Sequence, residues 1–193
     1  MIISQQENIV WEVICLEQFL AHILYLPDGT TVKQPLRQHN QKTAEIAGDA
    51  LLPAGLHTAA YLAGFLHDIG KYTSAYQQYL IKSARGDPDA PPKGSVNHTF
   101  AAVRFILTKW HGPQQDVYRR LAAEMLAYAA GAHHGSFDLA NEEGQIGFHH
   151  RLSDESIRYS EVMAAFEQDG EEEHINALFA KACEELRKVV DTL

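Results

Sequence analysis

A histidine and an aspartate stand next to each other at the end of an apolar run, and a glycine and a lysine follow: His67, Asp68, Gly70 and Lys71. Imidazole nitrogens and carboxylate oxygens are ligands that first-row divalent metals take. On a helix, His67 and Lys71 would share a face, with Asp68 turned about 100° away from His67. The segment therefore offers a nitrogen ligand, a carboxylate able to bridge two metals, and a cation beside them. A capped pair on the surface is the alternative, so further ligands must come from elsewhere.

Further candidate ligands lie within helices or at their edges, next to small or apolar residues. His39 is expected inside a helix, His98 at the start of one, and His133 and His134 at the end of another. A helical bundle can bring such positions to one central cavity. Five histidines and one aspartate would suffice for two metal ions that keep open coordination positions.

The length of 193 residues predicts one domain with a sizeable core. Hydrophobic residues make up 46% and charged residues 21% of the chain, as in ordinary globular proteins. No apolar run approaches the ~20 residues of a membrane span, and the N-terminus has no basic region of a secretory signal. The two cysteines, Cys15 and Cys183, do not make a disulfide framework. These features predict a cytoplasmic protein without a membrane segment.

The net charge of −9 is carried by one part of the chain. Residues 1–137 have 11 basic and 11 acidic side chains, whereas residues 138–193 have 5 basic and 14 acidic ones. The acidity therefore indicates solvated helix faces near the C-terminus. It argues against a broad basic surface for duplex binding, but not against a nucleic-acid strand held near His67.

Apolar periodicity predicts an all-α fold with one small β-hairpin. The hairpin is expected over residues 23–32, with Pro27, Asp28 and Gly29 in its turn. Gly70 is placed to end or bend the helix before it, and Thr73 or Ser74 suits an N-cap. Loops are expected at 85–94 and 135–151. Helices are expected at 7–20, 36–51, 56–69, 73–84, 97–110, 115–131, from 153 or 154 to about 167, and 171–192.

The order of these ligands resembles the HD superfamily of metal-dependent phosphohydrolases. Its spacing is similar to the HD nuclease domain of the CRISPR-associated nuclease-helicase of type I systems. The resemblance covers about residues 36–136, roughly half of the chain. It is carried by His39 and by the phrases Leu66-His67-Asp68-Ile69-Gly70-Lys71, Asn97-His98-Thr99 and Ala132-His133-His134-Gly135.

The resemblance implies an HD-domain helical bundle that cuts single-stranded DNA with one or two divalent ions, whether Mn, Fe, Co, Ni, Zn or Mg. By analogy, His39, His67 and Asp68 hold one ion. Asp68 bridges to a second ion, and Lys71 stabilises charge on the phosphate. Two ions ~3.5–4 Å apart can activate a water and stabilise the leaving oxygen of a phosphodiester. The implied ligands of the second ion are Asp68, His98, His133 and His134.

One family feature has no clear counterpart in this sequence. The family has a further aspartate late in the domain, in a helix after the paired histidines, which completes the first metal site. Asp191 is in a predicted helix but close to its end, and Asp154 and Asp169 suit cap or loop positions. We expect an HD domain cut just short of that aspartate. An existing aspartate in its place, or a weak first site, is the alternative.

The resemblance also implies partners and a setting in antiviral defence. Residues 1–193 would be a single nuclease domain, either the N-terminal part of a longer nuclease-helicase or its stand-alone partner. No GxxxxGK[ST] phosphate-binding loop occurs, so this chain itself carries no such ATPase. The resemblance implies that a superfamily 2 helicase, fused or separate, supplies the DNA strand. A CRISPR RNA-guided surveillance complex would recruit both proteins. Two other functions remain open: an HD phosphohydrolase acting on nucleotides or small phosphate esters, and a non-catalytic HD-like docking module.

The remaining histidines are expected to be structural. His57 would lie ~15 Å from His67 on the same helix, at 1.5 Å per residue. The pair His149 and His150 lacks the small-residue setting of the earlier pair. Surface or partly buried positions are expected for His22, His111 and His174, and a substrate contact for one of Tyr72, Tyr76 and Tyr79.

Overall fold

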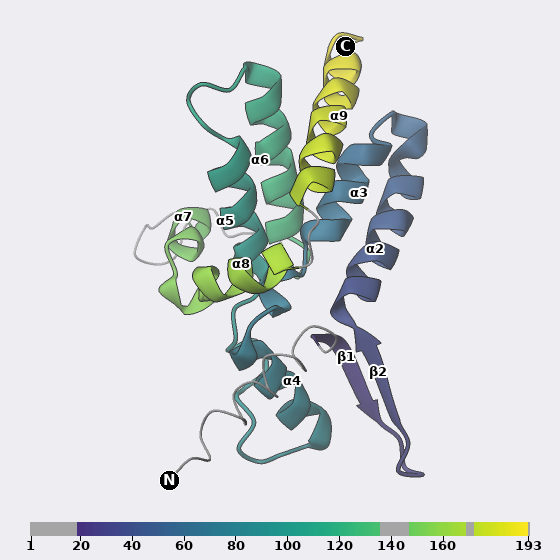
Figure 1. Cartoon of the computed structure of the whole chain (residues 1–193), viewed down its shortest axis with the longest axis vertical. Helices are drawn as coiled ribbons and strands as arrows, with labels where there is room; N and C mark the ends of the chain where they lie inside the picture. The colour runs from purple at the N-terminus through teal and green to yellow at the C-terminus, as the bar shows by residue number, and fades with distance from the viewer. Residues whose placement is uncertain (1–18, 136–146, 169–171, 193) are drawn as a thin grey trace, which may run out of the picture.

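The computed structural model describes residues 19–135, 147–168 and 172–192, and it confirms the expected all-α fold with a small hairpin (Figure 1). The greater part of the predicted helix 7–20 lies outside these residues. The hairpin consists of β1 (Leu20–Tyr25) and β2 (Thr31–Pro35). The helices are α2 (Leu36–Leu51), α3 (His57–Leu66), α4 (Ser74–Arg85), α5 (Thr99–Trp110), α6 (Val117–Gly131), α7 (Gly147–Leu152), α8 (Tyr159–Gln168) and α9 (Glu172–Val190), with short 3-10 helices η2 (Leu52–Ala54), η3 (Ile69–Lys71) and η4 (Glu155–Ile157).

The hairpin begins earlier than predicted, at Leu20, so the expectation that a helix continues to this residue is wrong. The side chain of Gln77 in α4 binds both backbone groups of Leu20: its amide donates to the carbonyl oxygen, and its oxygen accepts from the N–H, each at 3.0 Å. This tertiary contact holds the start of β1 in an extended form. The strands pair antiparallel, and their register shifts between Leu20 and His22.

Helix α3 is the centre of the molecule, and it packs against α2, α6 and α9. A helix surrounded in this way should be apolar on most of its faces, and Leu62, Phe65 and Leu66 are all buried. Its crossing with α2 is very close, because a Cβ atom at Gly64 would lie 2.9 Å from the Cα atom of Ala44. This contact of small residues sets the distance between the later turns of α3 and the middle of α2.

A second pair of helices, α5 and α6, pack against each other and carry much of the remaining core, and α6 lies beside α3. Phe100, Val103 and Ile106 of α5 are buried. At its end, Trp110 stacks on Phe179 of α9 with ring centroids 4.2 Å apart. The hydrophobic core is continuous through these helices and α8. The loop after α3, the loop before α5 and the end of α6 therefore meet at one end of the bundle.

Some predicted boundaries differ from the observed ones for local reasons. Helix α3 ends at Leu66 rather than 69, and the chain continues as a turn and η3. Part of the predicted loop 135–151 is helical as α7. Asp154 does cap a helix, but this helix is the short η4. The Asp154 carboxylate accepts a hydrogen bond from the Ser156 N–H at 2.9 Å. The N-cap at Thr73 is confirmed, because its hydroxyl accepts from the Tyr76 N–H at 3.2 Å.

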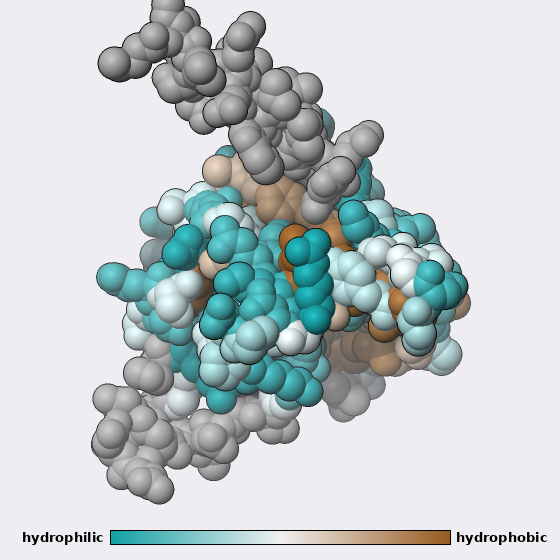
Figure 2. All heavy atoms as spheres, turned by 90° about the horizontal axis from the view of Figure 1, so that it is seen from below, coloured by the Kyte–Doolittle hydropathy of each residue, from teal (hydrophilic) through white to brown (hydrophobic). Residues whose placement is uncertain are grey.

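Among the described residues no helix is both long and apolar enough to cross a bilayer. Figure 2 shows the end of the molecule near α4 and the hairpin, and most of the coloured surface there is hydrophilic, with smaller hydrophobic areas between.

Candidate metal centre

The predicted HD pair lies where α3 ends, on the turn that leads into η3. Asp68 is 2% exposed and Lys71 is 4% exposed, so both charged side chains are buried. The Lys71 Nζ atom lies 2.8 Å from Oδ2 of Asp68. Because α3 stops at Leu66, Lys71 comes back over the turn and contacts Asp68 directly, rather than standing one helical turn beyond His67. A buried carboxylate is thus held by a buried cation.

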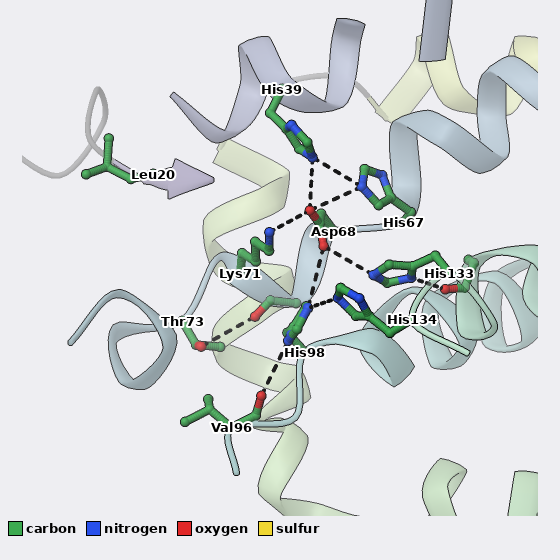
Figure 3. A network of polar contacts seen from close by, with 12 residues as sticks. Leu20, His39, His67, Asp68, Lys71, Thr73, Val96, His98, His133 and His134 are labelled. Atoms are coloured by element: carbon green, nitrogen blue, oxygen red, sulfur yellow. Dashed lines mark hydrogen bonds and ion pairs between the residues drawn. The ribbon is translucent and has the colours of Figure 1, made fainter. Parts of the chain in front are cut away.

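One group of ligands surrounds the Oδ2 atom of Asp68 (Figure 3). The Nε2 atoms of His39 and His67 each lie 3.1 Å from this oxygen. The two Nε2 atoms are 3.3 Å from each other. His39 comes from the second turn of α2 and His67 from the end of α3, so the close crossing of these helices brings the two rings together. These three residues could hold one metal ion.

A second group faces Oδ1, the other oxygen of Asp68 (Figure 3). The Nε2 atom of His133 lies 3.5 Å from Oδ1, and that of His98 lies 3.7 Å away. His134 joins the group through His98, with 2.9 Å between their Nε2 atoms. The start of α5 supplies His98 and the end of α6 supplies the paired histidines. These four residues could hold another ion, with Asp68 common to both groups.

Backbone carbonyl groups orient three of the histidine rings. In each ring Nδ1 faces a carbonyl oxygen, so its N–H can donate there while Nε2 keeps a free lone pair toward Asp68. Such outer hydrogen bonds fix the tautomer and direction of metal-binding imidazoles. The pairs are His67 with Gly64 at 2.7 Å, His133 with Ala130 at 2.6 Å, and His98 with Val96 at 3.4 Å.

Electrostatics at the centre favour the protonation states that bind metals. Burial alone raises the pKa of Asp68, but the contacts of its carboxylate with the ring nitrogens of His133, His39 and His67 outweigh it, and the net pKa lies well below its ordinary value. Burial lowers the pKa of His98 to about 4. Burial also lowers the pKa of His134, with the neighbouring His133 adding to the effect. At neutral pH Asp68 is therefore a carboxylate and His98 a neutral imidazole, the protonation states that metal ligation requires.

Two buried atoms show that the residues fit a metal ion. Oδ1 of Asp68 and Nε2 of His133 are both inaccessible to solvent, and neither has a hydrogen-bond partner among the described residues. Buried polar atoms are rarely left without partners, because their desolvation costs about 1–3 kcal/mol each. Both atoms are lone-pair donors that point to the same space, so a divalent cation would satisfy both.

A polar cleft of about 810 Å³ opens beside the second group. The inner wall contains Lys71, His98 and His134, so the cleft leads directly to the candidate ligands. Farther out it is lined by Tyr79 and by the exposed basic residues Lys93 and Arg151. This cleft joins the centre to solvent and offers both cationic and aromatic contacts to a ligand.

The structure thus brings together every residue that the sequence analysis selected as a ligand, with Lys71 beside them. Of the three tyrosines considered as substrate contacts, Tyr72 is in the core and Tyr76 packs under His98 with 4.7 Å between ring centroids. Tyr76 and Tyr79 both line the cleft, whereas Tyr72 does not. The role of Lys93 and Arg151 as cleft residues was not foreseen, because loop and short-helix positions carry no periodic signal.

None of the other aspartates and histidines that the sequence analysis considered belongs to either group within the described part of the chain. Asp191 accepts a hydrogen bond from the Tyr118 hydroxyl at 2.9 Å. Asp154 accepts one from the Asn97 amide at 3.0 Å. His111 instead lies 2.7 Å from the carboxylate of Glu124. Asp169 and the side chains of His149 and His150 lie outside the described residues, whereas His57 and His174 are described but lie in neither group.

Comparisons with known proteins agree with this geometry. The comparison with curated proteins finds no match. The model of one protein family, described as Cas3, HD domain, matches residues 28–192. The match includes β2, all the described helices and every residue of the two ligand groups. The chain therefore belongs to the Cas3 HD-domain family, whose members are metal-dependent nucleases of CRISPR interference.

Proposed function

We propose that this chain hydrolyses phosphodiester bonds of single-stranded DNA at a two-ion centre bridged by Asp68. The observation that carries the proposal is the division of the Asp68 carboxylate, with Oδ2 facing His39 and His67 and Oδ1 facing His98 and His133. When bound, two divalent ions supply water activation and stabilisation of the leaving oxygen. We propose His39, His67 and Asp68 as ligands of one ion, and Asp68, His98, His133 and His134 as ligands of the other.

Lys71 has two proposed tasks at this centre. Its ammonium group fixes the Asp68 carboxylate through the 2.8 Å contact with Oδ2. The same side chain lines the cleft, where a substrate phosphate would lie. A fixed positive charge there stabilises the negative charge that develops on phosphorus, and it requires no reorganisation during the reaction. Asp68 and Lys71 are therefore the proposed catalytic residues.

The cleft supports a single strand as the substrate. Single-stranded nucleic acids are bound by grooves that pair cationic side chains with aromatic stacking platforms, and Lys93, Arg151 and Tyr79 line this cleft. A duplex would need a broad basic surface, whereas the net charge of the chain is −9. A modest intrinsic affinity for DNA suffices if a helicase delivers the strand. We therefore propose that residues 1–193 form one nuclease domain that works with a superfamily 2 helicase, fused or separate. The two would act in the cytoplasm on targets marked by an RNA-guided surveillance complex.

Cleavage of labelled single-stranded DNA by the metal-stripped protein tests the proposal, with Mn²⁺, Co²⁺, Ni²⁺, Mg²⁺ or Zn²⁺ restored in turn. We expect cleavage that requires a metal and is lost in Asp68→Ala. The matched control is Asp191→Ala, because Asp191 contacts Tyr118 and belongs to neither ligand group. A circular single strand in the same assay separates endonucleolytic from exonucleolytic cleavage.

Two outcomes would favour the alternative functions. Release of phosphate from nucleotides, with oligonucleotides left intact, would indicate an HD phosphohydrolase. Metal binding that raises stability, with no phosphodiester cleaved under any metal, would indicate a docking module that uses the ions for folding.

A further inference from the structure

His22 lies next to the first ligand group, although its position in the sequence gives no sign of it. It belongs to β1, at the point where the hairpin register shifts between Leu20 and His22. Such bulges turn a side chain out of the regular alternation, and they are frequent beside active sites. The exposed ring of His22 lines the polar cleft together with Lys71. The irregular register thus places one more imidazole at the edge of the centre.

The geometry of His22 toward His39 matches that of histidine pairs within the ligand groups. The ring centroids of His22 and His39 are 5.0 Å apart, with an interplanar angle of 78°. His98 and His134 have 5.0 Å and 75°, and His39 and His67 have 5.2 Å and 50°. The spacing of the His22 and His39 rings is therefore like that of neighbouring rings within the two groups.

The first group has room for another ligand. It has three donors, whereas the second has four. Among the described residues no carboxylate other than Asp68 belongs to either group, and Asp191 and Asp154 have hydrogen-bond partners elsewhere. The His22 ring lies outside the set of mutually close donor atoms. The ring is exposed at the edge of the cleft, and binding the ion requires its side chain to rotate toward Asp68.

We propose that His22 is an additional ligand of the ion that His39, His67 and Asp68 would hold. The inference rests on the two-ion centre of the proposed function. The hairpin then has a task in this fold, because its bulge delivers a nitrogen ligand from a strand to a centre that is otherwise built from helix ends.

Metal titration of the stripped protein tests this inference independently of catalysis. We expect the wild type to bind two Co²⁺ ions, and His22→Gln to bind one as before and the other on the order of 10- to 100-fold more weakly. The absorption of the weakened Co²⁺ site should change, because one nitrogen donor is lost. His57→Gln is the matched control, since His57 is at the opposite end of α3 from His67.

The unfolding midpoint of the stripped protein should be the same in His22→Gln and the wild type, because an exposed strand residue contributes little packing. Two tight ions and an unchanged Co²⁺ spectrum in His22→Gln would overturn the inference. A raised KM for DNA with unchanged metal affinity would also overturn it, by making His22 a substrate contact. If the wild type bound no ion, the proposed function itself would fail, whereas two ions unaffected by His22→Gln would remove this inference alone.

Discussion

The Cα atom of Gly70 lies directly against the carbonyl group of His98, so closely that a Cβ atom at position 70 would overlap the carbonyl oxygen. This contact joins the turn that carries Asp68 and Lys71 to the segment that carries His98. The distance between Asp68 and His98 is therefore set by the absence of a side chain at Gly70. Gly70 lies inside η3 and does not end α3, which stops at Leu66, so the sequence His67-Asp68-Ile69-Gly70-Lys71 needs its glycine for this packing.

Replacement of Gly70 by alanine should destabilise the protein by about 2 kcal/mol or more, because backbone atoms cannot yield as a flexible side chain would. Urea unfolding measures the change. Gly112→Ala is the control, because the nearest atom to a Cβ there is in the Gln114 side chain at 3.7 Å, an ordinary contact. Equal stabilities of the two variants would contradict the close approach at Gly70.

Replacement of Lys71 by methionine should lower kcat for single-stranded DNA by about 10²- to 10³-fold, with a much smaller change in KM. The reason is that the proposed role of Lys71 is to fix Asp68 and stabilise charge formed in the transition state. Steady-state kinetics on the metal-loaded protein measures both constants, and circular dichroism checks folding. The control variant is Lys82→Met, on an exposed turn of α4, and it should leave both kcat and KM unchanged. A loss confined to KM would show that Lys71 only binds substrate.

The stability of the metal-stripped protein should fall between pH 7 and pH 5. Burial lowers the pKa of His98 from 6.5 to about 4 in the folded state, so the unfolded chain takes up a proton in this interval while the folded chain does not. Stability therefore decreases as pH falls, by about 2 kcal/mol from this residue. Asp68, whose folded pKa is also lowered, loses its contribution only below its unfolded value of about 4. Urea unfolding at both pH values checks the effect, and His98→Gln should reduce it.

Replacement of Glu185 by alanine should destabilise the fold by about 1–2 kcal/mol without removing metal binding. The Glu185 carboxylate in α9 accepts hydrogen bonds from the backbone N–H groups of Thr58 and Ala59 at 2.8 and 3.0 Å, and so caps the N-terminus of α3 from another helix. Thermal unfolding and Co²⁺ titration measure the two properties. The neighbouring, exposed Glu184 provides the control variant. Equal losses in both variants would mean that the cap contributes nothing.

Helical periodicity and ligand spacing predicted much of the fold and of the centre. The apolar runs of α3 and α5 predict buried helices because a helix surrounded by others must be apolar on most faces. The ligands were predictable because divalent metals bind only a few types of side chain. In addition, His67, Asp68 and the paired His133 and His134 stand at predicted helix ends. The end of α3 was predicted less well, since the turn at Asp68 depends on contacts made outside the helix.

By itself, the sequence determined the all-α class, the hairpin and the residues able to bind metals, because these follow from local periodicity and side-chain chemistry. Only the tertiary structure decided which oxygen of Asp68 faces which histidines, because that depends on how α2, α3, α5 and α6 cross. It also decided the position of His22. Strand register depends on pairing with β2 and on the contact of Gln77 with Leu20, and a shift of one residue moves a side chain to the other face of the hairpin.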